Sequence, residues 1–398
     1  QSEDYVVYER PDNKEYFNGA QVSEDGNWLI ITVGKGTERM NMVYFKNLTM
    51  GKAPIMPIVE NLNNSWDFIG NDGSVFYFET DKDASRGKVV KVDALAQQNG
   101  WTDVIPESAD TLTGVSFINN QFVLNYLKDA ATQIKIYETS GKFVRDVKLP
   151  GIGSAGGFGG KRSYTEAFYS YSSFNAPPTI YRYDLKTGKS TLFRQSSVKF
   201  DPSEFEVKQV FYTSKDGTKV PMFLTYRKGL KLNGKNPTLL YGYGGFNIPQ
   251  TPGFSVGRVA WLEMGGVYAV ACIRGGSEYG KDWWKGGSRL NKQNTFDDFA
   301  WAGKWLIENK YTSTPKLAIQ GGSNGGLLVG AVLNQHPDLF GAAIPQVGVM
   351  DMLRFQKFTI GWAWTSDYGD PKDEADFKAM YAYSPYHQAK PGTKYPPT

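Results

Sequence analysis

Leu317-Ala-Ile-Gln-Gly-Gly-Ser-Asn-Gly-Gly-Leu327 is the stretch of sequence that decides the fold of the second half of this chain. It starts as an apolar strand, turns at a glycine-rich segment that fits the pattern G-x-S-x-G, and enters a helix predicted over residues 325–335. Such a turn exposes a serine hydroxyl at a helix N-terminus, where developing negative charge is favoured. A glycine-rich turn with an incidental serine is the alternative. The order of strand, turn and helix favours Ser323 as the nucleophile of a serine hydrolase.

Strands and helices alternate through the second half of the chain. Apolar runs at residues 238–241 and 267–273 predict strands that are covered on both faces of a sheet. Residues 294–309 have the apolar spacing of an amphipathic helix, with Asn294 or Thr295 as its cap. Alternation of this kind produces a parallel sheet with flanking helices, and we expect residues 198–398 to form such a domain.

The first half of the chain repeats a unit of two strands and a turn. The second strand of each unit ends at Asn47, Asp93, Glu138 and Asp184, which are 46, 45 and 46 residues apart. A repeat of this length made only of strands is typical of propeller blades. An irregular β-sandwich is the alternative, and the regular spacing argues against it. Residues 1–197 are therefore predicted to form about four blades of a β-propeller.

The composition is that of a globular protein of 398 residues, with 40% hydrophobic and 21% charged residues. The net charge of +4 is spread without a block of Lys and Arg, so nucleic acid is not expected as a partner. No apolar run approaches the roughly 20 residues of a membrane-spanning helix. Because the chain starts with Gln1, either a leader was removed or the chain is a fragment, and cytoplasmic, periplasmic and secreted locations all stay open.

A serine nucleophile needs hydrogen-bond donors for the oxyanion that forms during its reaction. One candidate is the backbone N–H of Asn324, directly after the serine. The other is the segment Tyr241-Gly-Tyr-Gly-Gly-Phe246, a strand end followed by glycines about 80 residues upstream. A glycine turn with solvent-facing tyrosines is the alternative for that segment.

The nucleophile also needs a base, and the two histidines are poor candidates for it. His336 lies at the far end of the helix that follows the serine. His387 could join Asp367 or Asp370 in a triad, but one convincing strand separates it from the serine where two are normal. Two histidines and the single cysteine, Cys272, predict no metal site, and no cofactor is expected.

At this point the second half of the chain resembles the prolyl oligopeptidases, also called prolyl endopeptidases. The likeness extends over the whole second half, and the first half is similar to the propeller of that family. The matching segments are Leu240-Tyr-Gly-Tyr-Gly-Gly-Phe-Asn247, Ile273-Arg-Gly-Gly-Ser-Glu-Tyr-Gly280, Asn291-Lys-Gln-Asn-Thr-Phe-Asp-Asp298, Gly321-Gly-Ser-Asn-Gly-Gly326, Gln346-Val-Gly-Val-Met-Asp-Met352 and Thr359-Ile-Gly-Trp-Ala-Trp-Thr-Ser-Asp-Tyr-Gly369.

The resemblance implies a serine peptidase that cleaves short peptides after proline. It implies that Ser323 is the nucleophile, and that the Tyr243 hydroxyl and the Asn324 N–H form the oxyanion hole. Trp364 would stack on the prolyl ring, since an apolar aromatic slot suits a ring that has no N–H. The residues implied to line the same pocket are Phe246, Val349 and Tyr368.

The resemblance also implies that the chain is the middle portion of a longer, monomeric protein. The family pattern places the catalytic Asp and His beyond Thr398, and it has seven propeller blades and an N-terminal segment of the hydrolase domain. Two alternatives stay open. One is a related oligopeptidase or acyl-peptide hydrolase of other specificity. The other, for the 398-residue chain alone, is a catalytically incomplete peptide-binding protein.

Overall fold

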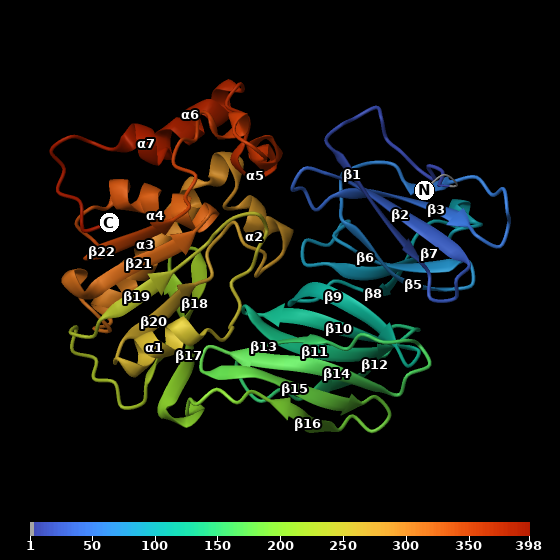
Figure 1. Ribbon diagram of the computed structural model, residues 1–398, viewed down its shortest axis with the longest axis horizontal. Helices are drawn as coiled ribbons and strands as arrows, with labels where there is room; N and C mark the ends of the chain where they lie inside the picture. Colours follow the sequence, from blue (N-terminus) through green and yellow to red (C-terminus); the bar gives the residue numbers. More distant parts are fainter. Residues whose placement is uncertain (1–3) are drawn as a thin grey trace.

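The computed structural model describes residues 4–398, which form two halves that lie side by side (Figure 1). Of these residues, those up to Gln195 fold into four separate sheets of four antiparallel strands, here called the propeller half. Those from Phe205 onward contribute one six-stranded sheet with helices, here called the hydrolase half. The succession of small sheets confirms the prediction of four propeller blades followed by an α/β domain.

Each blade is built from consecutive strands. The first blade contains β1 (Tyr16–Val22), β2 (Trp28–Lys35), β3 (Asn41–Asn47) and β4 (Met56–Val59). The second contains β5 (Trp66–Asp72), β6 (Val75–Thr80), β7 (Lys88–Asp93) and β8 (Thr102–Ile105). The third contains β9 (Thr111–Ile118), β10 (Gln121–Lys128), β11 (Ala131–Glu138) and β12 (Phe143–Val147). The fourth contains β13 (Ser154–Gly157), β14 (Glu166–Ser173), β15 (Ala176–Asp184) and β16 (Ser190–Gln195).

The repeat in the sequence corresponds to the two middle strands of each blade, because these strands carry the contacts between blades. The Trp28 ring of the first blade packs edge-on against Phe76 of the second, with ring centroids 5.2 Å apart. Phe45 meets the same ring at 5.6 Å. Burying such rings is the main stabilising contribution of a blade interface. Outer strands such as β1 and β16 are largely exposed and therefore lack a clear pattern.

The six-stranded sheet has the strand order β17-β18-β20-β19-β21-β22. The strands are β17 (Phe205–Thr213), β18 (Lys219–Arg227), β19 (Thr238–Tyr241), β20 (Val267–Ala271), β21 (Leu317–Gly322) and β22 (Ala342–Gln346). The last four are parallel as predicted, whereas β17 and β18 form an antiparallel hairpin that joins β20. Parallel pairing of Tyr241 with Gln320 brings the ends of β19 and β21 to one edge. The loops that follow these two strands are therefore neighbours.

Helices α1, α3 and α4 pack against this sheet, and the bounds of all helices and 3₁₀ turns of the described residues follow. The α-helices are α1 (Val256–Glu263), α2 (Lys281–Lys285), α3 (Gln293–Glu308), α4 (Asn324–Gln335), α5 (Thr365–Tyr368), α6 (Glu374–Tyr383) and α7 (Pro385–Gln388). The 3₁₀ turns are η1 (Gln97–Asn99), η2 (Pro202–Glu204), η3 (Arg289–Asn291), η4 (Thr314–Lys316), η5 (Phe355–Lys357) and η6 (Gly361–Trp364).

The predicted cap of α3 was wrong. Lys292 occupies the N-cap position with helical angles, φ −58° and ψ −29°, because η3 leads directly into α3. The hydroxyl of Thr295 instead donates to backbone carbonyls, and the Asn294 amide donates to Gly286 O at 2.9 Å. Both side chains thus tie the helix to the preceding loop.

The two halves contact each other through the first residue of α2 and the residues just before that helix. The Lys281 ammonium forms an ion pair with Asp81 of the second blade at 2.8 Å. The Tyr279 hydroxyl donates to Asp129 of the third blade at 2.8 Å. These contacts place the residues before α2 over the second and third blades. Across residues 4–398, no helix is long and apolar enough to span a membrane.

Candidate active site

Ser323 occupies a strained turn between β21 and α4. Its φ of 58° and ψ of −117° lie in a region that non-glycine residues rarely adopt, at a cost of about 1–3 kcal/mol. Its N–H donates to the carbonyl of Gln346 at 2.9 Å, which fixes the turn against the end of β22. The side chain remains exposed at the tip of the turn. This is the geometry that presents a serine hydroxyl to a substrate.

Glycines make this turn possible because other chain segments approach it closely. A Cβ atom at Gly321 would lie 2.2 Å from the carbonyl oxygen of Gly325. A Cβ atom at Gly325 would lie 2.7 Å from the carbonyl oxygen of Gly242. The second contact joins the serine turn to the loop after β19. The glycines of both segments thus allow the two loops to pack together.

The loop after β19 carries Tyr243 to the serine. Burial, reinforced by the charge of Asp367, raises the pKa of the Tyr243 hydroxyl, while a hydrogen bond with the Ser323 side chain partly lowers that pKa. The hydroxyl therefore lies beside the nucleophile and stays protonated as a donor. The backbone N–H of Asn324 belongs to the first turn of α4, where N–H groups have no partner within the helix.

The Asn324 side chain connects three segments, a role that sequence analysis missed. Its amide nitrogen donates to the Tyr243 carbonyl at 2.6 Å, and its amide oxygen accepts from the Tyr368 hydroxyl at 3.1 Å. The residue is 1% exposed. The buried amide therefore holds the Tyr243 loop and the Tyr368 helix at fixed positions relative to the serine turn.

A cavity of about 280 Å³, here called the ring pocket, opens beside Ser323. Its walls are mostly apolar and aromatic. Tyr368 meets Phe246 edge-to-face at 5.3 Å, and Trp364 lies parallel to Phe355 at 6.5 Å. The structure thus brings together six of the seven predicted site residues, and the seventh, Asn324, lies buried behind them. The six that line the pocket are Tyr243, Phe246, Ser323, Val349, Trp364 and Tyr368.

Two further residues line the ring pocket that the sequence did not indicate. Ile248 follows the Tyr243 loop, and Thr37 comes from the turn between β2 and β3 of the first blade. The Thr37 hydroxyl donates to the carbonyl of Ala363 at 2.8 Å, across 326 residues of sequence. The propeller half therefore completes the wall of the pocket. No local signal in the sequence could have shown this contact.

A buried ion pair braces the pocket from behind. Lys292 and Asp367 are each 1% exposed, and their charged groups lie 3.1 Å apart. The Lys292 ammonium also donates to the Gly244 carbonyl at 2.9 Å. The Asp367 carboxylate accepts from the Phe246 N–H and the Trp284 indole, both at 2.8 Å. The pair thus joins the Tyr243 loop to the segment that carries Trp364 and Tyr368.

Asp367→Asn is expected to lower the free energy of unfolding by about 3–5 kcal/mol, because it leaves the Lys292 ammonium buried without its countercharge. Burial already lowers the pKa of Lys292, and Asp367 opposes that effect. Urea unfolding would measure the loss. Removing both charges, in Asp367→Asn with Lys292→Met, should restore most of it. Glu374→Gln is the control, since its ion pair with Lys378 is exposed and contributes little.

Both histidines lie at the opposite end of α4 from Ser323. The helix has 12 residues and is therefore about 18 Å long, and His336 follows its last residue. The His336 ring packs edge-on against Trp301, and burial lowers its pKa. His387 hydrogen-bonds to Ser384 at 2.8 Å. It lies two residues after Pro385, and the Pro385 carbonyl accepts a hydrogen bond from the Asn334 side chain in the last turn of α4. Neither histidine reaches the serine.

Outside this site, the described residues include one cysteine, which is buried, and no cluster of metal ligands. Cys272 is fully buried, and burial raises its pKa well above the ordinary value, so it is a core residue. No group of three or more potential metal ligands occurs in the part of the chain that the structure describes. The ring pocket, the serine turn and the Tyr243 loop are therefore the candidate active site.

Two family profiles match the sequence. Residues 1–196 match the prolyl oligopeptidase N-terminal β-propeller domain, and residues 252–398 match the prolyl oligopeptidase family. A prolyl endopeptidase of Elizabethkingia meningoseptica is 44% identical over 100% of this chain. A prolyl oligopeptidase A of Amanita bisporigera is 37% identical, also over 100% of this chain. The chain spans 56% and 54% of the length of these two relatives.

Solved structures show the same similarity. A prolyl endopeptidase structure superimposes with a TM-score of 0.94 at 42% identity, covering 99% of this chain and 58% of that chain. Prolyl oligopeptidase B of Galerina marginata, bound to a 35mer hydrolysis and macrocyclization substrate, superimposes with a TM-score of 0.96 at 37% identity. That comparison covers 100% of this chain and 57% of the other.

Proposed function

The chain belongs to the prolyl oligopeptidase family, and from this we propose that the whole protein is a serine endopeptidase that cleaves short peptides on the carboxyl side of proline. The observation that carries the proposal is the ring pocket. It places a strained, exposed serine beside a slot walled by Trp364, Phe246 and Tyr368. A prolyl ring has no N–H that needs a hydrogen-bond partner, so it fits an apolar aromatic slot better than most other substrate side chains do.

The proposed reaction is acyl transfer in two steps. The Ser323 hydroxyl loses its proton to a base and attacks the carbonyl carbon of proline. The Tyr243 hydroxyl and the Asn324 N–H donate hydrogen bonds to the resulting oxyanion. The C–N bond then breaks, the base returns its proton to the departing amine, and an ester on Ser323 remains for water to hydrolyse.

The base is proposed to come from residues outside the 398 of this chain. His336 and His387 lie beyond the far end of α4, and the chain spans 56% of its Elizabethkingia relative. We propose that a histidine and an aspartate of the whole protein complete a triad with Ser323. We further propose that the boundary between the propeller domain and the hydrolase domain lies between residues 197 and 198. We also propose that the protein acts as a monomer and needs no nucleic acid, membrane or cofactor.

Trp364→Ala is expected to lower kcat/KM for cleavage after proline by about 10- to 100-fold, and to affect cleavage after alanine much less. The reason is that the indole contacts the ring and not the backbone of the substrate. Paired peptides that differ only in proline or alanine before the cut, assayed with the full-length protein, would measure the ratio.

Trp362→Ala is the matched control for this substitution. Trp362 lies in the same 3₁₀ turn but stacks on Phe17 of the first blade at 6.5 Å, outside the ring pocket. Its loss should leave the ratio of proline to alanine cleavage unchanged. An equal loss for both peptides in Trp364→Ala would remove the indole from the site of specificity. Absence of cleavage after proline in the full-length wild-type protein would overturn the proposed function itself.

A further inference from the structure

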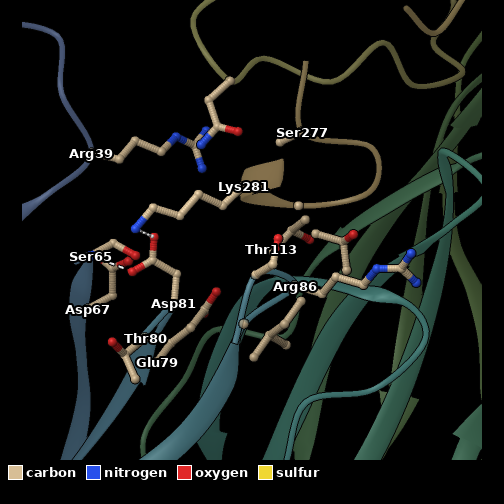
Figure 2. Close-up of a pocket in the computed structure, with 16 residues that line it drawn as sticks. Arg39, Ser65, Asp67, Glu79, Thr80, Asp81, Arg86, Thr113, Ser277 and Lys281 are labelled. Carbon is tan, nitrogen blue, oxygen red and sulfur yellow. Dashed lines mark hydrogen bonds and ion pairs between the residues drawn. The ribbon is translucent and has the colours of Figure 1, made fainter. Parts of the chain in front are cut away.

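A second cavity, of about 290 Å³, lies between the first three blades on one side and the start of α2 with the residues before it on the other (Figure 2). We call it the remote cavity. Charged side chains line it in place of aromatic ones, and they come from both halves of the molecule. Those used below are Arg39, Asp67, Glu79, Asp81 and Lys281.

Some of these charges are already neutralised. Figure 2 shows the Lys281 ammonium next to the Asp81 carboxylate, and the two groups lie 2.8 Å apart. The other carboxylate oxygen of Asp81 accepts from the Ser65 N–H at 2.9 Å. Asp81 and Lys281 therefore hold the wall of the cavity together and do not need a ligand.

Asp67 and Glu79 differ from Asp81 in this respect. Among residues 4–398, neither carboxylate makes a hydrogen bond or ion pair, and the charges that act on Glu79 are those of Asp67 and Arg39. Burial, followed by the charge of Asp67, raises the pKa of Glu79 to about 8, while Arg39 lowers that pKa. Asp67 and Glu79 are direct partners across strands β5 and β6, so their like charges repel. A cation that entered the cavity would relieve both effects.

A buried acceptor points to the same kind of ligand. The side-chain oxygen of Asn247 is buried, and it has no hydrogen-bond partner in the described part of the chain. Asn247 lines the remote cavity together with the two carboxylates. An unpaired buried acceptor is unfavourable, so a donor is favoured there. An ammonium group offers three N–H donors and no acceptor, so it can pair with carboxylate and amide oxygens alike.

The remote cavity lies close to the ring pocket, and a small cavity of about 20 Å³ lies between them. This small cavity shares Thr37 and Phe246 with the ring pocket. It also shares Arg39 and Asn247 with the remote cavity. Phe246 and Asn247 are consecutive, so their Cα atoms are about 3.8 Å apart. An extended peptide advances about 3.3 Å per residue, so a few residues cover the distance between cavities that neighbouring residues line.

We propose that the remote cavity is a specificity subsite that takes the ammonium group of a lysine, or of the peptide's own amino terminus, a few residues from the cleaved bond. This inference rests on the proposed function, because the peptide in the ring pocket is the substrate class proposed there. It adds a charge preference that the ring pocket alone does not produce.

The test is a set of fluorogenic peptides with one proline and one lysine, assayed with the full-length protein. The lysine moves from four residues before the proline to four residues after it. Each peptide is paired with one that carries acetyl-lysine, which has the same shape without the charge. Free and acetylated amino termini are compared separately. At one register, meaning one spacing between the lysine and the proline, we expect the lysine peptide to be cleaved with about tenfold higher kcat/KM than its acetyl-lysine counterpart.

Asp67→Asn with Glu79→Gln should reduce this advantage to less than about twofold. Asp67→Asn alone serves if the double variant fails to fold, because the Asp67 side chain is exposed. Glu60→Gln is the matched control. It removes the same charge from an exposed residue after β4 that does not line the remote cavity, and it should keep the full advantage.

Binding of the same peptides to Ser323→Ala, measured by fluorescence anisotropy, separates this inference from the proposed function. The preference for lysine over acetyl-lysine is expected there whether or not wild-type protein cleaves after proline. A proline peptide without lysine reports on the proposed function alone. The inference is overturned if no register prefers the charged peptide, or if the preference persists in the Asp67 and Glu79 variants as it does in Glu60→Gln.

Discussion

Ser323→Ala in the full-length protein is expected to lower kcat for cleavage after proline by about 10⁶-fold, the largest effect of any substitution considered. The strained turn aims this one hydroxyl at the substrate, and no neighbouring group lies in the same position. Without it no acyl-enzyme forms, and only binding and oxyanion stabilisation remain. Hydrolysis of a peptide whose proline is followed by a chromophore would measure the loss.

The variant should still fold and bind peptide, because the hydroxyl is exposed and packs against little else. A fluorophosphonate that labels wild-type full-length protein should not label the variant. Activity above a tenth of the wild-type value would assign the nucleophile to another residue and reject the proposed mechanism.

Tyr243→Phe is expected to lower kcat by about 10²- to 10³-fold with little change in KM. The hydroxyl lies beside Ser323, and burial raises its pKa, so it donates a hydrogen bond at neutral pH. A donor aimed at the developing oxyanion acts more strongly in the transition state than on the bound substrate. Steady-state kinetics of the full-length variant would separate kcat from KM.

Tyr241→Phe is the matched control for this prediction. Tyr241 ends β19 two residues earlier, and it does not line the ring pocket. Its substitution should leave kcat within about twofold of wild type. A rise in KM with unchanged kcat in Tyr243→Phe would show that the hydroxyl binds substrate and transition state equally, and would remove it from the oxyanion hole.

Much of the fold could be predicted because its signals are local. The serine turn requires glycines at fixed positions next to a strand and a helix, and all of these lie within residues 317–335. The middle strands of the blades recur as recognisable apolar segments because they are largely buried and their rings pack against neighbouring blades. The edge strands β1 and β16 carry no such pattern, since they are largely exposed, and sequence analysis found no edge strand of any blade.

Details of the site escaped prediction where distant segments share one interaction. The cap of α3 was predicted at Asn294 or Thr295, but both side chains bond to the loop that precedes the helix. The Asn324 side chain could not be assigned its contacts, because its partners, Tyr243 and Tyr368, lie 81 and 44 residues away. Long-range polar contacts leave no periodic pattern in a sequence.

The sequence by itself determined the serine turn and the four blades, because strand period, turn geometry and glycine placement act over a few residues. The resemblance to a known family, and not these local patterns, indicated most of the residues that form the ring pocket. Only the tertiary structure decided what surrounds that pocket. It placed Thr37 of the first blade in the pocket wall, the Lys292–Asp367 pair behind it, and the remote cavity beyond it. These features depend on how the two halves pack together, and packing brings together side chains that are separated by hundreds of residues in the chain.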